Sequence, residues 1–107
     1  MIDLKNNVLC PKFEAAFELL GKRWTGLIIQ VMLNGPKRFS DFQEVIPNLS
    51  PRMLTERLKE LEEHGVVVRQ VYPEMPVRIE YELTDKGRDL QNVMTEVQAW
   101  ASKWSKE

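Results

Sequence analysis

The most constraining feature of this chain is a change of apolar periodicity between residues 51 and 83. Leu54, Leu58 and Leu61 recur at helical spacing, which places them on one face of a helix. Apolar and charged side chains then alternate one by one over residues 77–83, which is the pattern of a half-buried strand. The sequence therefore predicts a helix that is followed by a β-hairpin.

Local signals mark the ends of these elements. Ser50 is a typical N-cap residue, and Pro51 suits the first position of a helix because its missing N–H is not needed there. Gly65 is expected to end this helix near Glu63. Residues 66–72 form the partner strand of residues 77–83, and residues 73–76 (Pro-Glu-Met-Pro) form the tip of the hairpin.

The same reasoning divides the rest of the chain. Helices are predicted over residues 11–20, from near Trp24 to residue 33, and over residues 41–46 with Ser40 as N-cap, and residues 37–39 form a short extended stretch. A last helix is predicted from Thr84 to about Lys103. This order describes one domain over residues 1–107, mainly α with a β-hairpin wing (α+β), a winged helix-turn-helix with additional helices at both ends.

Composition narrows the possible functions. With 107 residues and a net charge of −1, the chain is one domain without a general basic character, so any basic surface must be local. One cysteine and one histidine exclude a disulfide framework and most metal sites, and no phosphate-binding glycine loop is visible. We expect no cofactor, no enzymatic activity, no signal peptide or membrane span, and a cytoplasmic protein with a reduced thiol.

Several dispersed blocks of the sequence resemble one family. The stretches CPKFEAAFELLGKRWTGLIIQVMLNGPKRFSDF, LSPRMLTERLKELEEHGVV and VYPEMPVRIEYELTDKG resemble the HxlR family of bacterial winged-helix regulators, over residues 10–104. The resemblance is greatest to the branch that senses quinones, electrophiles and oxidants through an N-terminal cysteine. It implies a homodimeric transcription factor, often a repressor, that binds a pseudo-palindromic double-stranded DNA operator.

The candidate DNA-binding residues lie in three segments. In a helix-turn-helix the second helix enters the major groove with its N-terminal residues, and Arg52 is the best candidate for a guanine contact. Arg57 and Lys59 are expected to meet the DNA backbone. Glu56 could accept from a cytosine or pair with Arg52, four residues earlier. The full set, which includes the segment before the third helix and the wing, is Lys37, Arg38, Ser40, Ser50, Pro51, Arg52, Thr55, Arg57, Lys59 and Arg78.

The lone cysteine is the candidate sensor. If Pro11 is the first helical residue, Cys10 is the N-cap, and a thiolate there faces unpaired N–H groups and the positive end of the helix dipole. Its pKa should therefore fall, which favours reaction with a quinone or another electrophile. Some relatives pair this cysteine with others near the C-terminus. This chain has none there, which leaves an adduct, a mixed disulfide or a Cys10–Cys10 bond.

The last helix carries a heptad-spaced apolar seam that is typical of an interface. The candidate dimer contacts, which include two aromatic residues of the first helix, are Phe13, Phe17, Leu90, Met94, Val97, Trp100, Ala101 and Trp104. Two alternatives stay open at this point. The protein could be controlled by a non-covalent ligand, or it could be a protein-binding winged helix in which Cys10 is structural.

Overall fold

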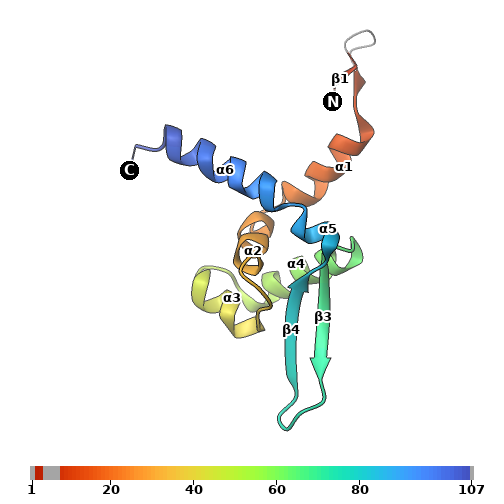
Figure 1. Ribbon diagram of the computed structural model, residues 1–107, viewed down its shortest axis with the longest axis vertical. Helices are drawn as coiled ribbons and strands as arrows, with labels where there is room; N and C mark the ends of the chain where they lie inside the picture. The colour runs from red at the N-terminus through yellow and green to blue at the C-terminus, as the bar shows by residue number, and fades with distance from the viewer. Residues whose placement is uncertain (1, 4–7, 107) are drawn as a thin grey trace.

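The computed structural model describes residues 2–3 and 8–106. Its elements are β1 (Ile2–Asp3), β2 (Val8–Leu9), α1 (Pro11–Leu20), α2 (Thr25–Met32), α3 (Phe39–Val45), α4 (Pro51–Glu63), β3 (Val67–Tyr72), β4 (Arg78–Leu83), α5 (Asp85–Arg88) and α6 (Gln91–Trp104). Figure 1 shows a body formed by α2–α5 with the β3–β4 hairpin, from which α1 and α6 project in different directions. We call these two helices the arms. The predicted α+β winged helix-turn-helix is confirmed.

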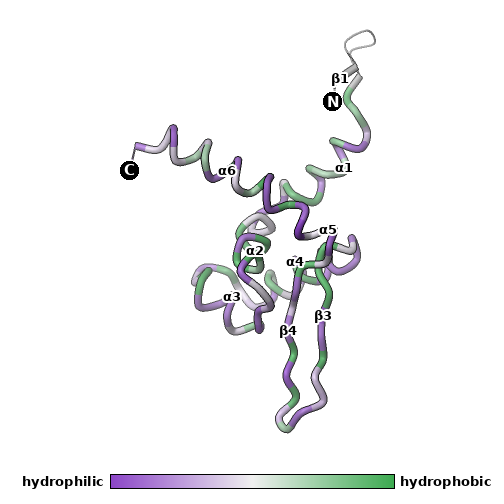
Figure 2. Tube along the Cα trace, viewed as in Figure 1, coloured by the Kyte–Doolittle hydropathy of each residue, from purple (hydrophilic) through white to green (hydrophobic). Residues whose placement is uncertain are grey.

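One continuous apolar core holds the body together. Figure 2 shows hydrophobic residues along α2 and α4, the helices at the centre of the body, while the hairpin tip is mostly hydrophilic. The core face predicted for α4 is confirmed, since Leu54, Leu58 and Leu61 are at most 1% exposed. The buried apolar residues of the whole body are Ile28, Ile29, Met32, Phe42, Ile46, Leu49, Leu54, Leu58, Leu61, Val66, Val67 and Leu83.

α4 has the boundaries that its sequence signals predict. The Ser50 hydroxyl oxygen accepts a hydrogen bond from the Met53 N–H at 3.1 Å, and Pro51 occupies the first turn. Beyond the helix, Gly65 has φ +71°, a left-handed conformation that glycine adopts without steric cost. The helix that is expected to read DNA is thus fixed at both ends by local chemistry.

The start of α3 differs from the prediction. The helix begins at Phe39 and its N-cap residue is Arg38, not Ser40. The reason is the carboxylate of Asp41, which accepts a hydrogen bond from the Arg38 N–H at 2.8 Å and so satisfies a free donor at the helix end. Ser40 lies exposed inside the first turn, and the helix ends at Val45 rather than Ile46.

The wing is a regular antiparallel hairpin. β3 pairs with β4 from Val67 opposite Leu83 to Tyr72 opposite Arg78. Of the extended stretch predicted at residues 37–39, only Lys37 forms a bridge to the sheet. The Lys37 N–H donates to the Tyr81 carbonyl at 2.9 Å, and the Tyr81 N–H donates to the Lys37 carbonyl at 2.7 Å. This bridge attaches the segment before α3 to the hairpin.

The last helix is broken, which corrects the prediction of one helix from Thr84 to Lys103. Thr84 caps α5 by accepting from the Gly87 N–H at 3.2 Å. Gly87 is buried so closely that a Cβ there would lie 2.3 Å from the Val66 carbonyl oxygen. The Arg88 guanidinium donates to the Leu83 carbonyl at 2.7 Å. These contacts hold α5 on the hairpin, and the chain changes direction at residues 89–90 before α6 begins (Figure 1).

The arms contrast with the body. None of the residues of α1 or α6, all of which the structure describes, is buried. The radius of gyration is 16.0 Å, whereas a compact domain of this length has about 13 Å. Phe13 and Phe17, two of the candidate dimer contacts, contact each other with ring centroids 4.9 Å apart. The arms therefore project from the body, although Leu19, Leu20 and Met94 at their inner ends pack against its core.

Candidate nucleic-acid interface and cysteine site

The N-terminal end of α4 presents an exposed polar surface. The Arg52 side chain is 90% exposed, and its Nε lies 3.8 Å from a Glu56 carboxylate oxygen, a loose pair one helical turn apart. The Ser50 oxygen caps the helix as an acceptor, which leaves its hydroxyl hydrogen available. The Thr55 hydroxyl instead donates to the Pro51 carbonyl at 2.9 Å, so it offers a ligand only its lone pairs.

The two basic residues further along α4 lie in different surroundings. Lys59 is exposed. The Arg57 side chain is only 14% exposed, because its Nε donates to the Arg23 carbonyl at 2.9 Å and its Nη1 contacts Glu60 at 3.1 Å. The structure thus places Arg57 apart from the other candidate DNA contacts, as a tie between α4 and the α1–α2 loop.

The α1–α2 loop that receives Arg57 contains a conformation that the sequence did not predict. Trp24 has φ +80°, the one positive φ outside glycine among the described residues, and Arg23 lies over its ring at 4.5 Å. Lys22 forms an ion pair with Glu60 at 2.8 Å and lowers the pKa of that carboxyl. No sequence pattern signals a left-handed tryptophan, since the conformation is imposed by packing around the loop.

The segment before α3 brings a second basic group to the surface. Arg38 and Ser40 are exposed, while Lys37 is half-buried and its backbone is held by the bridge to the wing. The positive charge of Arg38 also contributes to lowering the pKa of Glu74 in the wing tip. The main cause of this lowered pKa is the hydrogen bond from Arg78, and the contribution of Arg38 is smaller.

The wing arginine is already paired within the protein. Arg78 contacts Glu74 at 2.8 Å and Glu80 at 2.6 Å, and its guanidinium lies 3.9 Å from the centre of the Tyr72 ring. Hydrogen bonding to Arg78 lowers the pKa of Glu74. One signal was visible in the sequence, since Arg78 and Glu80 are two residues apart on a strand and share a face.

Cys10 occupies the predicted N-cap of α1. Its carbonyl accepts the first helical hydrogen bond, from the Glu14 N–H at 3.1 Å, and its side chain is partly exposed. The backbone N–H groups of Phe13 and, to a smaller extent, Lys12 lower the pKa of the thiol. Their positive dipoles stabilise the thiolate, so the site favours the nucleophilic form of sulfur.

Two kinds of feature are absent from the described part of the chain. Over residues 2–3 and 8–106, no group of three or more His, Cys, Asp or Glu side chains is placed to hold a metal ion. Within the same residues, no helix is long and apolar enough to cross a membrane. The only histidine, His64, follows α4, where its carbonyl accepts from Lys86 at 2.7 Å.

The family model for the HxlR-like helix-turn-helix matches residues 19–107. The chain is 58% identical to the HTH-type transcriptional regulator YodB of Bacillus subtilis, over 92% of this chain and 88% of YodB. The structure of reduced YodB superposes with a TM-score of 0.81 at 56% identity, covering 92% of this chain and 97% of that one. YodB has also been solved in diamide-treated and quinone-bound forms.

The redox regulator HypR has the same fold. The oxidised form of HypR superposes with a TM-score of 0.85 at 36% identity, covering 92% of this chain and all of HypR. The winged body and the exposed end of α4 are consistent with these matches, which extend across nearly the whole chain. The chain belongs to the HxlR family of helix-turn-helix proteins and is a DNA-binding transcriptional regulator.

Proposed function

We propose that this protein is a homodimeric repressor whose affinity for its DNA operator changes when an oxidant or an electrophile such as a quinone modifies Cys10. The observation that carries the proposal is the position of the thiol. The lone cysteine caps α1, an arm without buried residues, where backbone N–H groups lower its pKa. The diamide-treated and quinone-bound structures of YodB support the same class of chemistry.

In this proposal the first turn of α4 carries the sequence readout. Arg52 in this turn is 90% exposed, and it can exchange its loose pair with Glu56 for the O6 and N7 of a guanine. Pro51 and Thr55 border the same surface. The residues that contact phosphates and orient the helix are Ser50, Arg38, Ser40, Lys37 and Lys59. Arg78 reaches DNA only after its ion pairs with Glu74 and Glu80 break.

The arms supply the dimer. Val97, Trp100 and Trp104 of α6 are 56%, 68% and 68% exposed, and Phe17 of α1 is 54% exposed. Large apolar side chains gathered on projecting helices indicate an interface, and a second copy of the chain offers the same surface in return. A twofold dimer places two α4 helices about 34–36 Å apart, one turn of DNA.

The covalent step needs only the groups at the site. The Cys10 thiolate adds to an unsubstituted ring carbon of a quinone: a sulfur–carbon bond forms, the carbon–carbon π bond breaks, and the conjugated carbonyl oxygen takes up a proton from water. The ring C–H proton at the attacked carbon then passes to solvent while the second carbonyl oxygen takes up a proton, which restores the aromatic ring. The product is a hydroquinone thioether, and no separate reductant is required. The adduct enlarges the N-cap residue of α1, which shifts this arm within the dimer and changes the separation of the two α4 helices.

The test compares wild type with Cys10→Ser. After treatment with a benzoquinone, mass spectrometry should show one adduct per wild-type chain, and a mobility-shift assay should show a changed operator affinity. The Cys10→Ser protein should bind DNA normally and ignore the quinone. A Cys10→Ser protein that still responds like wild type overturns the sensor assignment.

The DNA-binding surface is tested with two arginines of the same helix. Arg52→Ala should weaken operator binding by about tenfold or more and relax base preference at one position, because a bidentate arginine–guanine contact contributes about 1–3 kcal/mol. Arg57→Ala is the matched control, since Arg57 faces the α1–α2 loop. Equal operator affinities of Arg52→Ala and wild type would contradict the proposed readout.

A further inference from the structure

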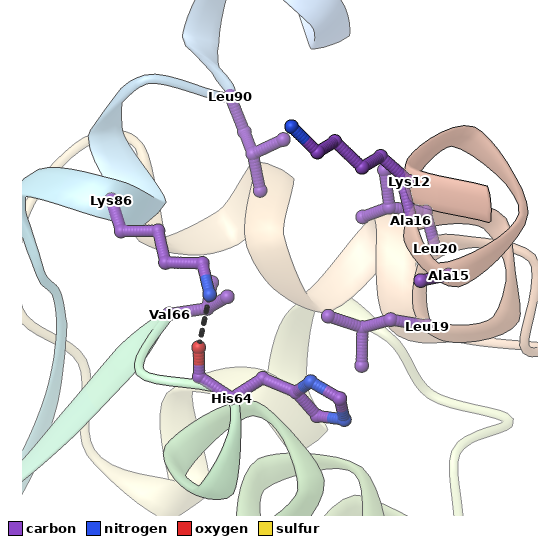
Figure 3. A pocket seen from close by; sticks show the side chains of 9 residues that line it. All are labelled: Lys12, Ala15, Ala16, Leu19, Leu20, His64, Val66, Lys86 and Leu90. Atoms are coloured by element: carbon purple, nitrogen blue, oxygen red, sulfur yellow. Dashed lines mark hydrogen bonds between the residues drawn. The ribbon is translucent and has the colours of Figure 1, made fainter. Parts of the chain in front are cut away.

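A cavity of about 310 Å³ lies between α1, the C-terminal end of α4 and the junction of α5 with α6 (Figure 3). This volume is at the lower end of the range in which proteins bind small molecules, roughly 300–1,000 Å³. Its apolar wall is made by Ala15, Ala16, Leu19, Leu20, Val66 and Leu90. The cavity is therefore large enough for a single aromatic ring with a short substituent.

The polar groups of the cavity are all neutral or positive among the described residues. They are Lys12, Lys86 and His64, and no acid lines the cavity. Glu18 lines a neighbouring cavity together with Lys22, not this one. A bound molecule with a negative charge thus meets two ammonium groups and no carboxylate.

Figure 3 shows how the two lysines face the cavity from different elements. Lys12 reaches from α1 toward Leu90, and Lys86 extends from α5 to the His64 carbonyl, which it contacts at 2.7 Å. A lysine ammonium has three donors, so Lys86 keeps two for a ligand. The Lys12 ammonium has no hydrogen-bond or ion-pair partner among residues 2–3 and 8–106.

We propose that this cavity is a reversible binding site for a small carboxylate with an apolar body, of the aromatic-acid class. The ring contacts the leucine and alanine wall, and the carboxylate lies between Lys12 and Lys86. An inorganic anion would leave the apolar wall uncovered, and a neutral aromatic compound would leave both ammonium groups without a counter-charge. Both halves of the proposed ligand are needed to match both halves of the cavity.

Such a ligand connects α1 to the α5–α6 junction, because Lys12 belongs to one arm and Leu90 immediately precedes the other. Occupancy would therefore fix the angle between the arms. The binding itself is independent of the proposed function. Its effect on operator affinity rests on the proposed dimer and is a separate readout.

The probe is benzoate, with benzamide as its neutral analogue, and the protein is full-length Cys10→Ser, so that thiol chemistry plays no part. Titration followed by methyl NMR should shift the resonances of Ala15, Ala16 and Leu90. Benzoate should bind about tenfold more tightly than benzamide, since a charge-assisted contact is roughly twice as strong as a neutral one.

Lys12→Gln and Lys86→Gln should each weaken benzoate binding by about tenfold, whereas Lys59→Gln on the exposed surface of α4 should leave it unchanged. If Lys86→Gln fails to fold, Lys12→Gln alone decides, because its ammonium has no described partner to lose. Equal binding of benzoate and benzamide, or lysine variants that bind like Lys59→Gln, overturns the proposal. A benzoate site that passes this test while Cys10→Ser still responds to quinone would refute only the thiol sensor.

Discussion

The body and the arms of this molecule contain the same kinds of apolar residue but differ in how far these residues are buried. Leu58 in the body is 1% exposed, whereas Trp100 in α6 is 68% exposed. The body completes its core within one chain, while the arms carry large apolar side chains that the chain does not cover. The contrast supports the proposal that the body carries the DNA-binding surface and that the arms form the dimer interface.

The largest effect should come from charging an arm. Trp100→Glu places a carboxylate in the proposed interface and should give a monomer by sedimentation. Losing the second half-site removes the gain from linked binding, so operator affinity should fall on the order of 10³-fold. Val45→Glu is the matched control, because Val45 is 63% exposed on the body. A Trp100→Glu dimer of wild-type affinity would break the distinction between body and arms.

A pair of truncations should separate the two regions by stability. Leu58→Ala leaves a cavity in the core and should lower the free energy of unfolding by about 2–5 kcal/mol. This loss should be the same at every protein concentration. Val97→Ala should instead cost little at low concentration and more as dimers form, because association stabilises only the assembled state. Urea denaturation at several concentrations measures both.

The pH dependence of Cys10 should be a property of the arm alone. Because its pKa is lowered in the folded chain, the midpoint of the alkylation rate against pH should lie below that of the same thiol in urea-unfolded protein. Trp100→Glu should show the same lowered midpoint. The thiolate also contributes stability above the unfolded pKa, and this contribution disappears as the pH falls through the folded pKa. Identical midpoints in folded and unfolded protein would show that the N-cap position does not lower the pKa of Cys10.

The smallest effect should come from the wing. Glu74→Gln frees part of the Arg78 guanidinium and removes one negative charge near Arg38, so DNA affinity should rise a few-fold and the slope of log affinity against log salt should steepen by about one. Dimerisation and stability should stay close to those of wild type, because an exposed ion pair contributes little. Glu63→Gln, at the far end of α4, serves as control. Weaker DNA binding by Glu74→Gln would show that this carboxylate supports DNA binding and does not reduce it by neutralising Arg78.

Much of the body was predictable because its signals are local. Ser50 and Pro51 define the start of α4, and the alternation before Leu83 defines β4. The Cys10 N-cap was predictable for the same reason, since a proline at the first helical position places the cysteine. These features need no knowledge of distant residues.

The remaining features depend on tertiary contacts, which periodicity does not contain. In the sequence, Arg57 resembles any basic residue on a helix surface, and only the structure shows that the α1–α2 loop lies beside it. The heptad spacing of the last helix begins at Leu90 and gives no sign of a break at residues 89–90. Only the close packing of Gly87 against Val66 shows that α5 belongs to the hairpin and that α6 does not.

Because α5 is held on the hairpin, α6 can rotate as a rigid unit about residues 89–90. The helix has 14 residues, and at about 1.5 Å per residue it spans about 21 Å from its pivot. A rotation of about 10° at residues 89–90 would carry Trp104 through almost 4 Å by the same geometry. In the proposed dimer, an adjustment too small to disturb any hydrogen bond of the wing would move the two α4 helices out of step with the turn of DNA.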